Sequence, residues 1–341
     1  MEVSGQCGQL VDGQGCPVAC RSVDRCASER GATSKAVNAF TGFEELHSLT
    51  PAWVTARRPH PVRNPTGRQL RFGAELRKLR ERAGLTATEA GQLLGVKQAQ
   101  ISNMEAGRVG VSPERVRALA CHYDCADQSL VQALSEMTSE RSRGWWEEYR
   151  ETLPNTLLDL AEMEHHATQL RAGITAHIPG LLQIHDHARE VFRQVVPELS
   201  PPDIEHRLSF RIKRQAVLFS ESPTPYRAYI HEAALRMQFG GRHVTRRQLQ
   251  HVINMSERSH ITVRVIPFTA GAFPGSGQSI LYAYGPVPPL DTVHLDQSHG
   301  SALIDAEAQL DKYRVLLDRM EGIALPPRES RELIRAIDQE L

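Results

Sequence analysis

Apolar residues recur every three to four positions from residue 68 to residue 139, and this spacing predicts a bundle of short helices. The rhythm breaks at Gly95 and then resumes, so two short helices are joined by a tight turn. Thr86 stands three residues before Glu89, as in a capping box at the start of the helix before the turn. We predict five helices in this region, of which the third covers residues 97–106.

A charged stretch at residues 139–143 ends this pattern, and the rest of the sequence indicates mixed helix and strand. Helices are predicted from residue 145 to about residue 195, then over 200–218, 244–258, 301–320 and 328–341. Alternating or β-branched runs predict four strands, namely Tyr226–His231, Ile261–Ile266, Ser279–Tyr284 and Thr292–Leu295. The predicted fold class is multidomain: an all-α five-helix helix-turn-helix domain at 67–139, followed by an α+β domain with a small sheet at 140–341.

Residues 1–66 are rich in Gly, Ser and Cys and show no sustained period, which predicts a disordered extension. The recognisable domain begins just after Val62, so a natural start near that residue, without residues 1–61, is a second expectation. The cysteines of this segment match no familiar zinc spacing, and they include no Cys-x2-Cys pair. Their role stays open between a metal knuckle and an unstructured extension: Cys7, Cys16, Cys20 and Cys26.

The 40 basic and 40 acidic residues of the chain cancel, so any surface for nucleic acid must be local. Residues 57–117 supply such a surface, with 13 basic residues against five acidic ones. No apolar run reaches the roughly 18 residues that a membrane helix needs, and the N-terminus lacks the pattern of a secretory signal. We therefore expect a cytoplasmic protein without a membrane segment.

The third predicted helix has the composition of a recognition helix. Ile101 and Met104 would face the core, which leaves the polar side chains free to enter a groove of DNA. Gln and Asn amides bond both edge groups of adenine, and Lys donates to guanine acceptors. The predicted base contacts come from Lys97, Gln98, Gln100 and Asn103. Contacts to the DNA backbone, which position without specifying, are predicted for Arg71, Thr88, Ser102 and Arg108.

A set of short runs marks residues 72–124: Gly84-Leu85-Thr86, Glu89-Ala90, Gly95-Val96, Ile101-Ser102 and Glu105-Ala106-Gly107. They resemble the helix-turn-helix of the phage Cro/CI repressor type, the xenobiotic-response-element (XRE) family. The resemblance implies DNA binding, with Gln98, Gln100 and Asn103 at positions that contact bases. Ala87 departs from it, since relatives often carry a Gln there that touches the DNA backbone. We expect Glu105 to have a structural role, because its charge repels phosphate.

The C-terminal part carries runs of its own: Trp145-Trp146, Ile178-Pro179-Gly180-Leu181-Leu182-Gln183, Arg211-x-x-Arg214-Gln215, Glu232-Ala233-Ala234-Leu235 and Val263-x-Val265-Ile266-Pro267. They resemble the uncharacterised domain of actinobacterial regulators that are described as antitoxin-like and are often encoded beside a small partner protein. The resemblance covers about residues 144–341. It implies a partner-binding or sensing role and carries over no chemistry.

The polar residues of this part allow several interpretations. Arg211, Arg214 and Gln215 form either an anion-binding face or, as we favour, a solvated face with internal ion pairs. Fifteen histidines raise the question of a metal, but in His231-Glu232-x-x-Leu235 a leucine replaces the second histidine of a zinc-peptidase motif. No catalytic or phosphate-loop motif is present either. We expect no metal, no cofactor and no enzymatic activity.

The sequence thus predicts a DNA-binding transcription regulator that binds a near-palindromic operator on double-stranded DNA as a homodimer. Its C-terminal domain is expected to bind a small protein encoded nearby. An alternative is a small-molecule sensor with an apolar pocket between the strands and the Gly271–Gly277 loop. A less favoured alternative is an enzymatic activity in that domain.

Overall fold

The computed structural model describes residues 64–139, 144–297 and 300–341, and all of them fall within one compact unit, Pro61–Leu341. The predicted extension and its four cysteines lie outside the described residues, apart from residues 64–66. Among the helices that are described, none has both the length and the apolar character needed to cross a membrane.

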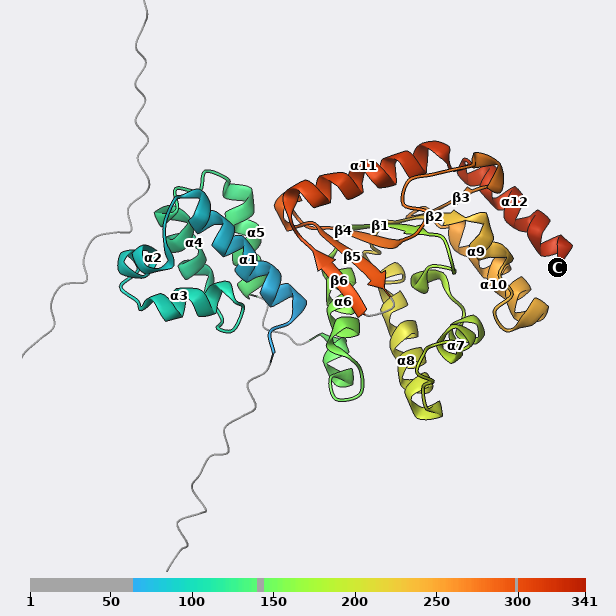
Figure 1. Cartoon of the computed structure of the whole chain (residues 1–341), viewed down its shortest axis with the longest axis horizontal. Helices are drawn as coiled ribbons and strands as arrows, with labels where there is room; N and C mark the ends of the chain where they lie inside the picture. Colours follow the sequence, from blue (N-terminus) through green and yellow to red (C-terminus); the bar gives the residue numbers. More distant parts are fainter. Residues whose placement is uncertain (1–63, 140–143, 298–299) are drawn as a thin grey trace, which may run out of the picture. The chain divides into compact units, whose positions relative to one another are not determined.

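Five helices form the N-terminal domain, as the apolar spacing predicts (Figure 1). Thr66 and Thr86 each cap a helix in a capping box, the first closed by Gln69 and the second by Glu89. Ser112 caps the fourth helix, which begins with proline. The helices are α1 (Gly67–Arg82), α2 (Ala87–Leu93), α3 (Gln98–Glu105), α4 (Pro113–His122) and α5 (Gln128–Ser139).

Two glycines allow these helices to pack closely. Gly73 of α1 lies against α3, where a Cβ atom would come within 2.2 Å of the carbonyl oxygen of Glu105. Gly95 in the turn has a φ of 65°, a left-handed conformation that costs glycine little. Val96 then donates its backbone N–H to the carbonyl of Gly91 at 2.8 Å. The direction of the turn therefore depends on Gly95, and the close approach of α1 to α3 depends on Gly73.

The C-terminal domain is built on a six-stranded mixed sheet with the order β3-β2-β1-β4-β5-β6. The strands β1, β2 and β3 are parallel, whereas β4, β5 and β6 run antiparallel to their neighbours. Helices connect the parallel strands, as a crossover connection requires. The strands are β1 (Gln169–Ile174), β2 (Tyr226–His231), β3 (Ile261–Ile266), β4 (Ser279–Tyr284), β5 (Thr292–Gln297) and β6 (Gly300–Ile304).

Helices cover both faces of this sheet (Figure 1). On one face α11 packs through Leu317 against Tyr282. On the other, Val252 of α10 and Ile334 of α12 join a core that includes Val263. The α-helices are α6 (Asn155–His166), α7 (His185–Arg193), α8 (Pro201–Arg214), α9 (Glu232–Arg236), α10 (Gly241–Ser256), α11 (Glu307–Ile323) and α12 (Pro327–Glu340). Short 3-10 turns are η1 (Trp145–Tyr149), η2 (Gly180–Leu182), η3 (Gln215–Leu218), η4 (Phe268–Ala270) and η5 (Pro288–Leu290).

The sequence pattern missed two strands of the sheet. β1 lies in the region predicted to be helical up to residue 195, and its alternation is hidden by the buried Arg171 and by Gly173. β6 occupies the predicted start of the helix at 301–320, so α11 begins only at Glu307. The predicted class, an all-α domain followed by an α+β domain, is confirmed.

Candidate nucleic-acid interface and polar sites of the C-terminal domain

Helix α3 has one buried face and one polar face. Ile101 and Met104 are 1% and 2% exposed and belong to the core of the bundle, as predicted. Lys97 stands at the N-cap with an exposed side chain. Gln98 is exposed in the first turn, and its Nε2 donates to Oγ of Ser102 at 2.9 Å. This bond holds the amide along the helix and thereby orients it.

Gln100 and Asn103 lie half-buried on the same helix. The structure places no side-chain hydrogen bond on either amide within the described residues, so both keep their donors and acceptors for a base edge. Together with Lys97 and Gln98 they occupy the start and middle of α3, the part of a recognition helix that reads bases. Their contacts with DNA stay a prediction.

The residues predicted to contact the DNA backbone differ in how exposed they are. Thr88 and Arg108 are exposed, and Ser102 is half-buried. Arg71 is only 8% exposed: it forms an ion pair with Glu75 and donates Nη2 to the carbonyl oxygen of Asp291 at 3.3 Å. A phosphate contact would require these bonds to break, so the structure argues against the contact predicted for Arg71.

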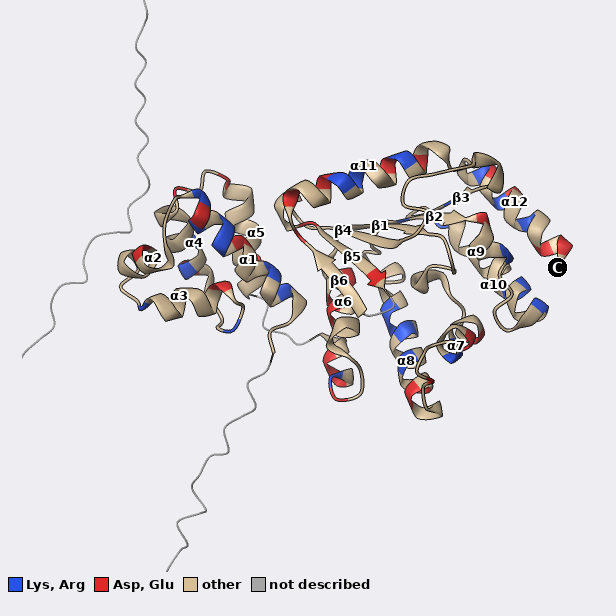
Figure 2. Cartoon of the chain, viewed as in Figure 1, with Lys and Arg blue, Asp and Glu red and all other residues tan. Residues whose placement is uncertain are grey.

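Basic residues are spread over the helices of the first domain (Figure 2), and several of them have internal partners. Arg80 binds Glu105 through two bonds of 2.5 and 2.9 Å, which agrees with the structural role expected for Glu105. The hydrogen bond to Glu105 raises the pKa of Arg80. Lys97 and Arg108 make no ion pair with another described residue. These two cations are therefore the better candidates for attracting DNA.

The first turn of α1 lies against α6. Gly67 donates its backbone N–H to Oδ1 of Asp159 at 2.8 Å, and Arg68 donates its own to Oε2 of Glu162 at 3.4 Å. Such free N–H groups give a helix N-terminus partial positive charge, which carboxylates balance. Burial raises the pKa of both carboxyl groups. Helix α1, which packs against α3, is thus also bound to α6.

A cavity of about 500 Å³ adjoins this contact. Its volume lies within the range of about 300–1,000 Å³ that is typical of small-molecule sites. Asp159 and Glu162 form part of its polar wall, and the loop 271–277, where a pocket was expected, does not line it. Apolar side chains of five elements complete the lining: Leu70, Met137, Met163, Tyr284 and Leu303.

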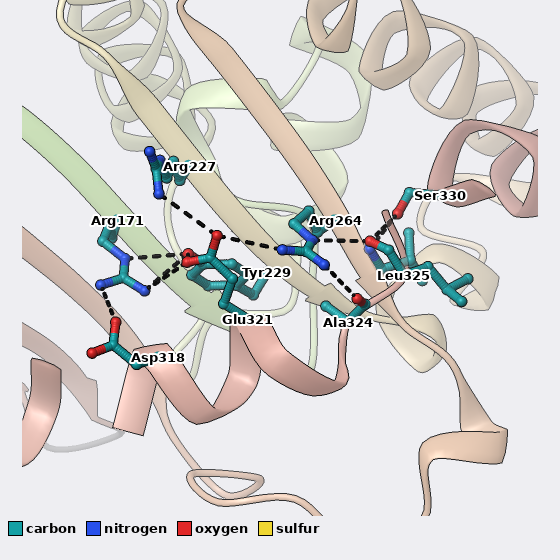
Figure 3. A network of polar contacts seen from close by, with 10 residues as sticks. Arg171, Arg227, Tyr229, Arg264, Asp318, Glu321, Ala324, Leu325 and Ser330 are labelled. Carbon is teal, nitrogen blue, oxygen red and sulfur yellow. Dashed lines mark hydrogen bonds and ion pairs between the residues drawn. The ribbon is translucent and has the colours of Figure 1, made fainter. Parts of the chain in front are cut away.

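Three arginines from the parallel strands converge on one carboxylate of α11 (Figure 3). Arg171 and Arg264 donate to Glu321 at 3.1 and 3.3 Å, and Arg227 lies 3.6 Å away. The hydroxyl of Tyr229 donates to the same carboxylate at 2.6 Å, and burial raises the pKa of Tyr229 to about 12. Because acidic residues of α11 balance the arginines, this network ties the helix to the sheet and offers no free anion site.

Two of the runs that carry the C-terminal resemblance meet after the carboxyl end of β1. Gln183 donates its Nε2 to the carbonyl of Ile178 at 2.7 Å. Gln215 donates to the carbonyl of Gln183, and Gln248 to that of Leu182, each at 2.7 Å. Side-chain amides therefore satisfy the backbone of this buried turn, as a buried carbonyl requires.

Basic residues gather along α8 (Figure 2), but their partners differ. Arg214 pairs with the buried Glu164 at 2.6 Å, so the predicted internal ion pair is present, but Arg214 is itself buried and the predicted solvated face is wrong there. Arg211 has no carboxylate within ion-pair distance among the described residues. It donates Nη1 to Oε1 of Gln183 at 2.5 Å and lies over the ring of Phe192, 4.5 Å from its centre. For Arg211 the anion-binding alternative therefore stays open.

The histidines serve separate local roles. In the part of the chain that the structure describes, no three His, Cys, Asp or Glu side chains are placed to hold a metal ion together. His231 caps α9 by accepting the N–H of Ala233 at 3.3 Å. Glu232 binds Arg236 at 2.7 Å and accepts the N–H of Phe268 at 2.9 Å. His231 and Glu232 thus stabilise α9 and its contact with the segment after β3.

The two domains match two different protein families. A helix-turn-helix domain matches residues 71–134, and a domain of unknown function, DUF5753, matches residues 157–336. The chain belongs to the DUF5753 family. Its N-terminal match is the domain of helix-turn-helix regulators, which bind DNA. Curated proteins and solved structures gave no significant match.

Sequence reasoning missed one group within the DUF5753 domain. This group is His187, which is 1% exposed although its near neighbour His185 on the same helix is exposed. Neither ring nitrogen of His187 has a hydrogen-bond partner among the described residues. Its neighbours His177 and Arg211 come from a turn and from another helix. No local pattern marks such a group, because it forms only in the folded domain.

Proposed function

We propose that this protein is a sequence-specific transcription regulator of the Cro/CI type that binds DNA as a homodimer. The helix-turn-helix match at residues 71–134, with four polar side chains on α3 opposite its buried face, is the observation that carries the proposal. Lys97, Gln98, Gln100 and Asn103 read bases, while Thr88, Ser102 and Arg108 contact the backbone. Two such helices enter successive major grooves of a near-palindromic operator.

Its DUF5753 domain receives the signal that changes DNA affinity. The C-terminal runs support the antitoxin-like assignment, in which a small protein encoded nearby binds this domain in the cytoplasm. The protein is not an enzyme in this proposal. A signal at the domain would act on DNA affinity through linkage, since α1 contacts both α6 and α3.

The deciding experiment measures binding of the full chain to its own upstream DNA and to a scrambled duplex over a salt series. We expect tight, sequence-dependent binding with a steep salt dependence. Gln98→Ala and Asn103→Ala should each cost about 1–3 kcal/mol and relax base preference at one position. Gln132→Ala on α5 is the matched control, since Gln132 is exposed away from α3. Equal affinity for both duplexes, with and without the neighbouring gene product, contradicts the proposal.

The cavity beside α1 supports a second candidate for the domain, the sensing of a small apolar molecule. Its lining is mainly apolar with a few polar groups, which is usual for such sites. The dye anilinonaphthalene sulfonate is a suitable probe. It should bind the wild type saturably and change its DNA affinity, and Ala74→Phe, which fills the cavity from α1, should abolish both effects. Unaltered dye binding in Ala74→Phe contradicts this candidate.

A further inference from the structure

Among the described residues, Arg211 differs from the buried arginines in having no carboxylate partner. Arg71, Arg80, Arg171 and Arg214 are buried, and each has a carboxylate within ion-pair distance. Arg211 is half-buried and has none, and its Nε is buried without any hydrogen-bond partner among the described residues. Leaving a buried charged group without its counter-charge is costly. An opposite charge that reaches Arg211 would therefore be bound favourably.

His187 provides a second unpartnered group beside Arg211. It lies on α7, five residues before Phe192, the ring that Arg211 covers. Both of its ring nitrogens are buried and have no partner in the part of the chain that the structure describes, although a neutral imidazole carries one N–H donor and one acceptor. Burial, and to a smaller extent the charges of His177 and Arg211, lowers the pKa of His187 to about 4.

His177 completes the group from the segment that follows β1. Its Nδ1 lies 3.1 Å from the carbonyl oxygen of Ile178, which makes Nδ1 the donor and leaves Nε2 without a bond. Burial lowers the pKa of His177, and the charge of Arg211 contributes. The side chain is half-buried, so the group reaches the surface at this residue.

The charged residues around Arg211 do not neutralise its positive charge. Glu164 is already paired with Arg214. Asp296 acts on Arg211 only as a more distant charge, outside ion-pair range, while Arg207 adds positive charge. Burial is the main reason why the pKa of Arg211 falls to about 9, and these neighbours do not restore it.

The position in the fold also favours ligand binding. In sheets with parallel strands, ligands bind beyond the carboxyl ends of the strands, and the turn that holds Gln183 lies in the connection that leaves the carboxyl end of β1. Gly180 lies next to Arg211, where even a Cβ atom would come within 3.6 Å of the guanidinium carbon. Gly180 thus packs beside the guanidinium without displacing it.

We propose that Arg211, His187 and His177 form a binding site for a small oxyanion, a phosphate or carboxylate group carried by a small molecule. The guanidinium supplies the charge and the free Nε–H, and His187 supplies one N–H donor. His177, whose Nδ1–H is already used by Ile178, donates from Nε2 when the bound anion favours its protonated form. The site is separate from the DNA-binding surface and from the cavity beside α1, so its test does not depend on either.

The test is a calorimetric titration of the full chain with inorganic phosphate and, separately, with succinate. We expect saturable binding of at least one of the two, and the better ligand identifies the kind of oxyanion. Arg211→Gln should weaken it by about tenfold or more, as expected for the loss of a charge-assisted bond. Arg207→Gln removes a positive charge one turn earlier on α8 and should change affinity less than about twofold.

His187→Phe keeps an aromatic ring and tests the site independently of Arg211. It should also weaken the binding, while circular dichroism confirms its fold and that of Arg211→Gln. In the wild type, the bound anion should raise the pKa of His187, observed by ¹⁵N NMR of the imidazole. The proposal is overturned if neither anion binds saturably. It is equally overturned if Arg207→Gln loses as much affinity as Arg211→Gln, since the attraction is then only diffuse.

Discussion

Arg80 and Glu105 are joined by two hydrogen bonds, 2.5 Å from Nε to Oε1 and 2.9 Å from Nη2 to Oε2. The same guanidinium donates Nη1 to the carbonyl of Leu85 at 2.7 Å, just before α2. One side chain of α1 therefore links the start of α2 to the end of α3. The orientation of the recognition helix depends on this link, which lies away from its DNA-reading residues.

Replacing Glu105 by alanine should lower the free energy of unfolding of the helix-turn-helix domain by about 3–5 kcal/mol. The reason is that a largely buried guanidinium loses its counter-charge. Urea denaturation measures the change. Glu81→Ala is the control: Glu81 pairs with Arg77 and lies 3.6 Å from Arg80, but it is 51% exposed, so its loss should cost less than about 1 kcal/mol. A Glu105→Ala protein of normal stability but weaker DNA binding would instead make Glu105 part of the interface.

Arg108 and Arg71 should respond differently to alanine. Arg108→Ala should weaken binding to all duplexes and reduce the salt slope by about 1, because one phosphate contact is lost. Arg71→Ala should leave the salt slope unchanged and lower the stability, since Arg71 is buried against Glu75 and Asp291. Affinity measured from low to high salt, together with urea denaturation, separates the two. A smaller salt slope in Arg71→Ala would instead support the phosphate contact that the sequence predicts for Arg71.

The network around Glu321 predicts a stability effect within the DUF5753 domain. Glu321→Ala removes the carboxylate shared by Arg171, Arg227 and Arg264 and should cost about 3 kcal/mol or more, because Arg171 is buried. Asp318→Asn is the control: Asp318 also binds Arg171, but it is 65% exposed, and its loss should cost under about 1 kcal/mol. Equal effects in thermal unfolding would contradict this account of the network.

Local patterns predicted the helical domain well and the sheet only in part. Thr86, Glu89 and Gly95 act on neighbouring residues, so capping and turn chemistry can be recognised from the sequence. In β1, by contrast, Arg171 faces the sheet surface that α11 covers, and its partners lie some 150 residues later. A strand with a buried arginine lacks the usual alternation, because long-range pairing makes the burial possible.

In the candidate sites, too, local patterns predict some features, and long-range contacts that the sequence does not reveal determine the others. The position of Ile101 and Met104 indicated which face of α3 is polar, since the helical period decides it. The burial of Arg71 depends on the carbonyl oxygens around residue 290, which no helical pattern reveals. The lack of a counter-charge at Arg211 is likewise hidden in the sequence, because nothing there shows that Glu164 pairs with Arg214.

The buried histidines predict how stability changes with pH. The pKa of His187 and that of His294 are each lowered to about 4, mainly by burial, whereas an unfolded histidine has a pKa of about 6.5. Between these values the unfolded chain binds protons that the folded chain does not. Stability is therefore fully present above about pH 6.5 and is lost as the pH falls toward 4. Each histidine contributes a slope of about 1.4 kcal/mol per pH unit.

Urea denaturation at a series of pH values between 7 and 4.5 measures this dependence. His187→Phe should reduce the slope by the share of one histidine, because the variant has no group to protonate there. His185→Gln changes an exposed neighbour on the same helix and should leave the slope as it is. If His187→Phe and the wild type lose stability in parallel, His187 is protonated in the folded state at the same pH as in the unfolded chain. Its buried, unpartnered ring would then have to be accessible to water.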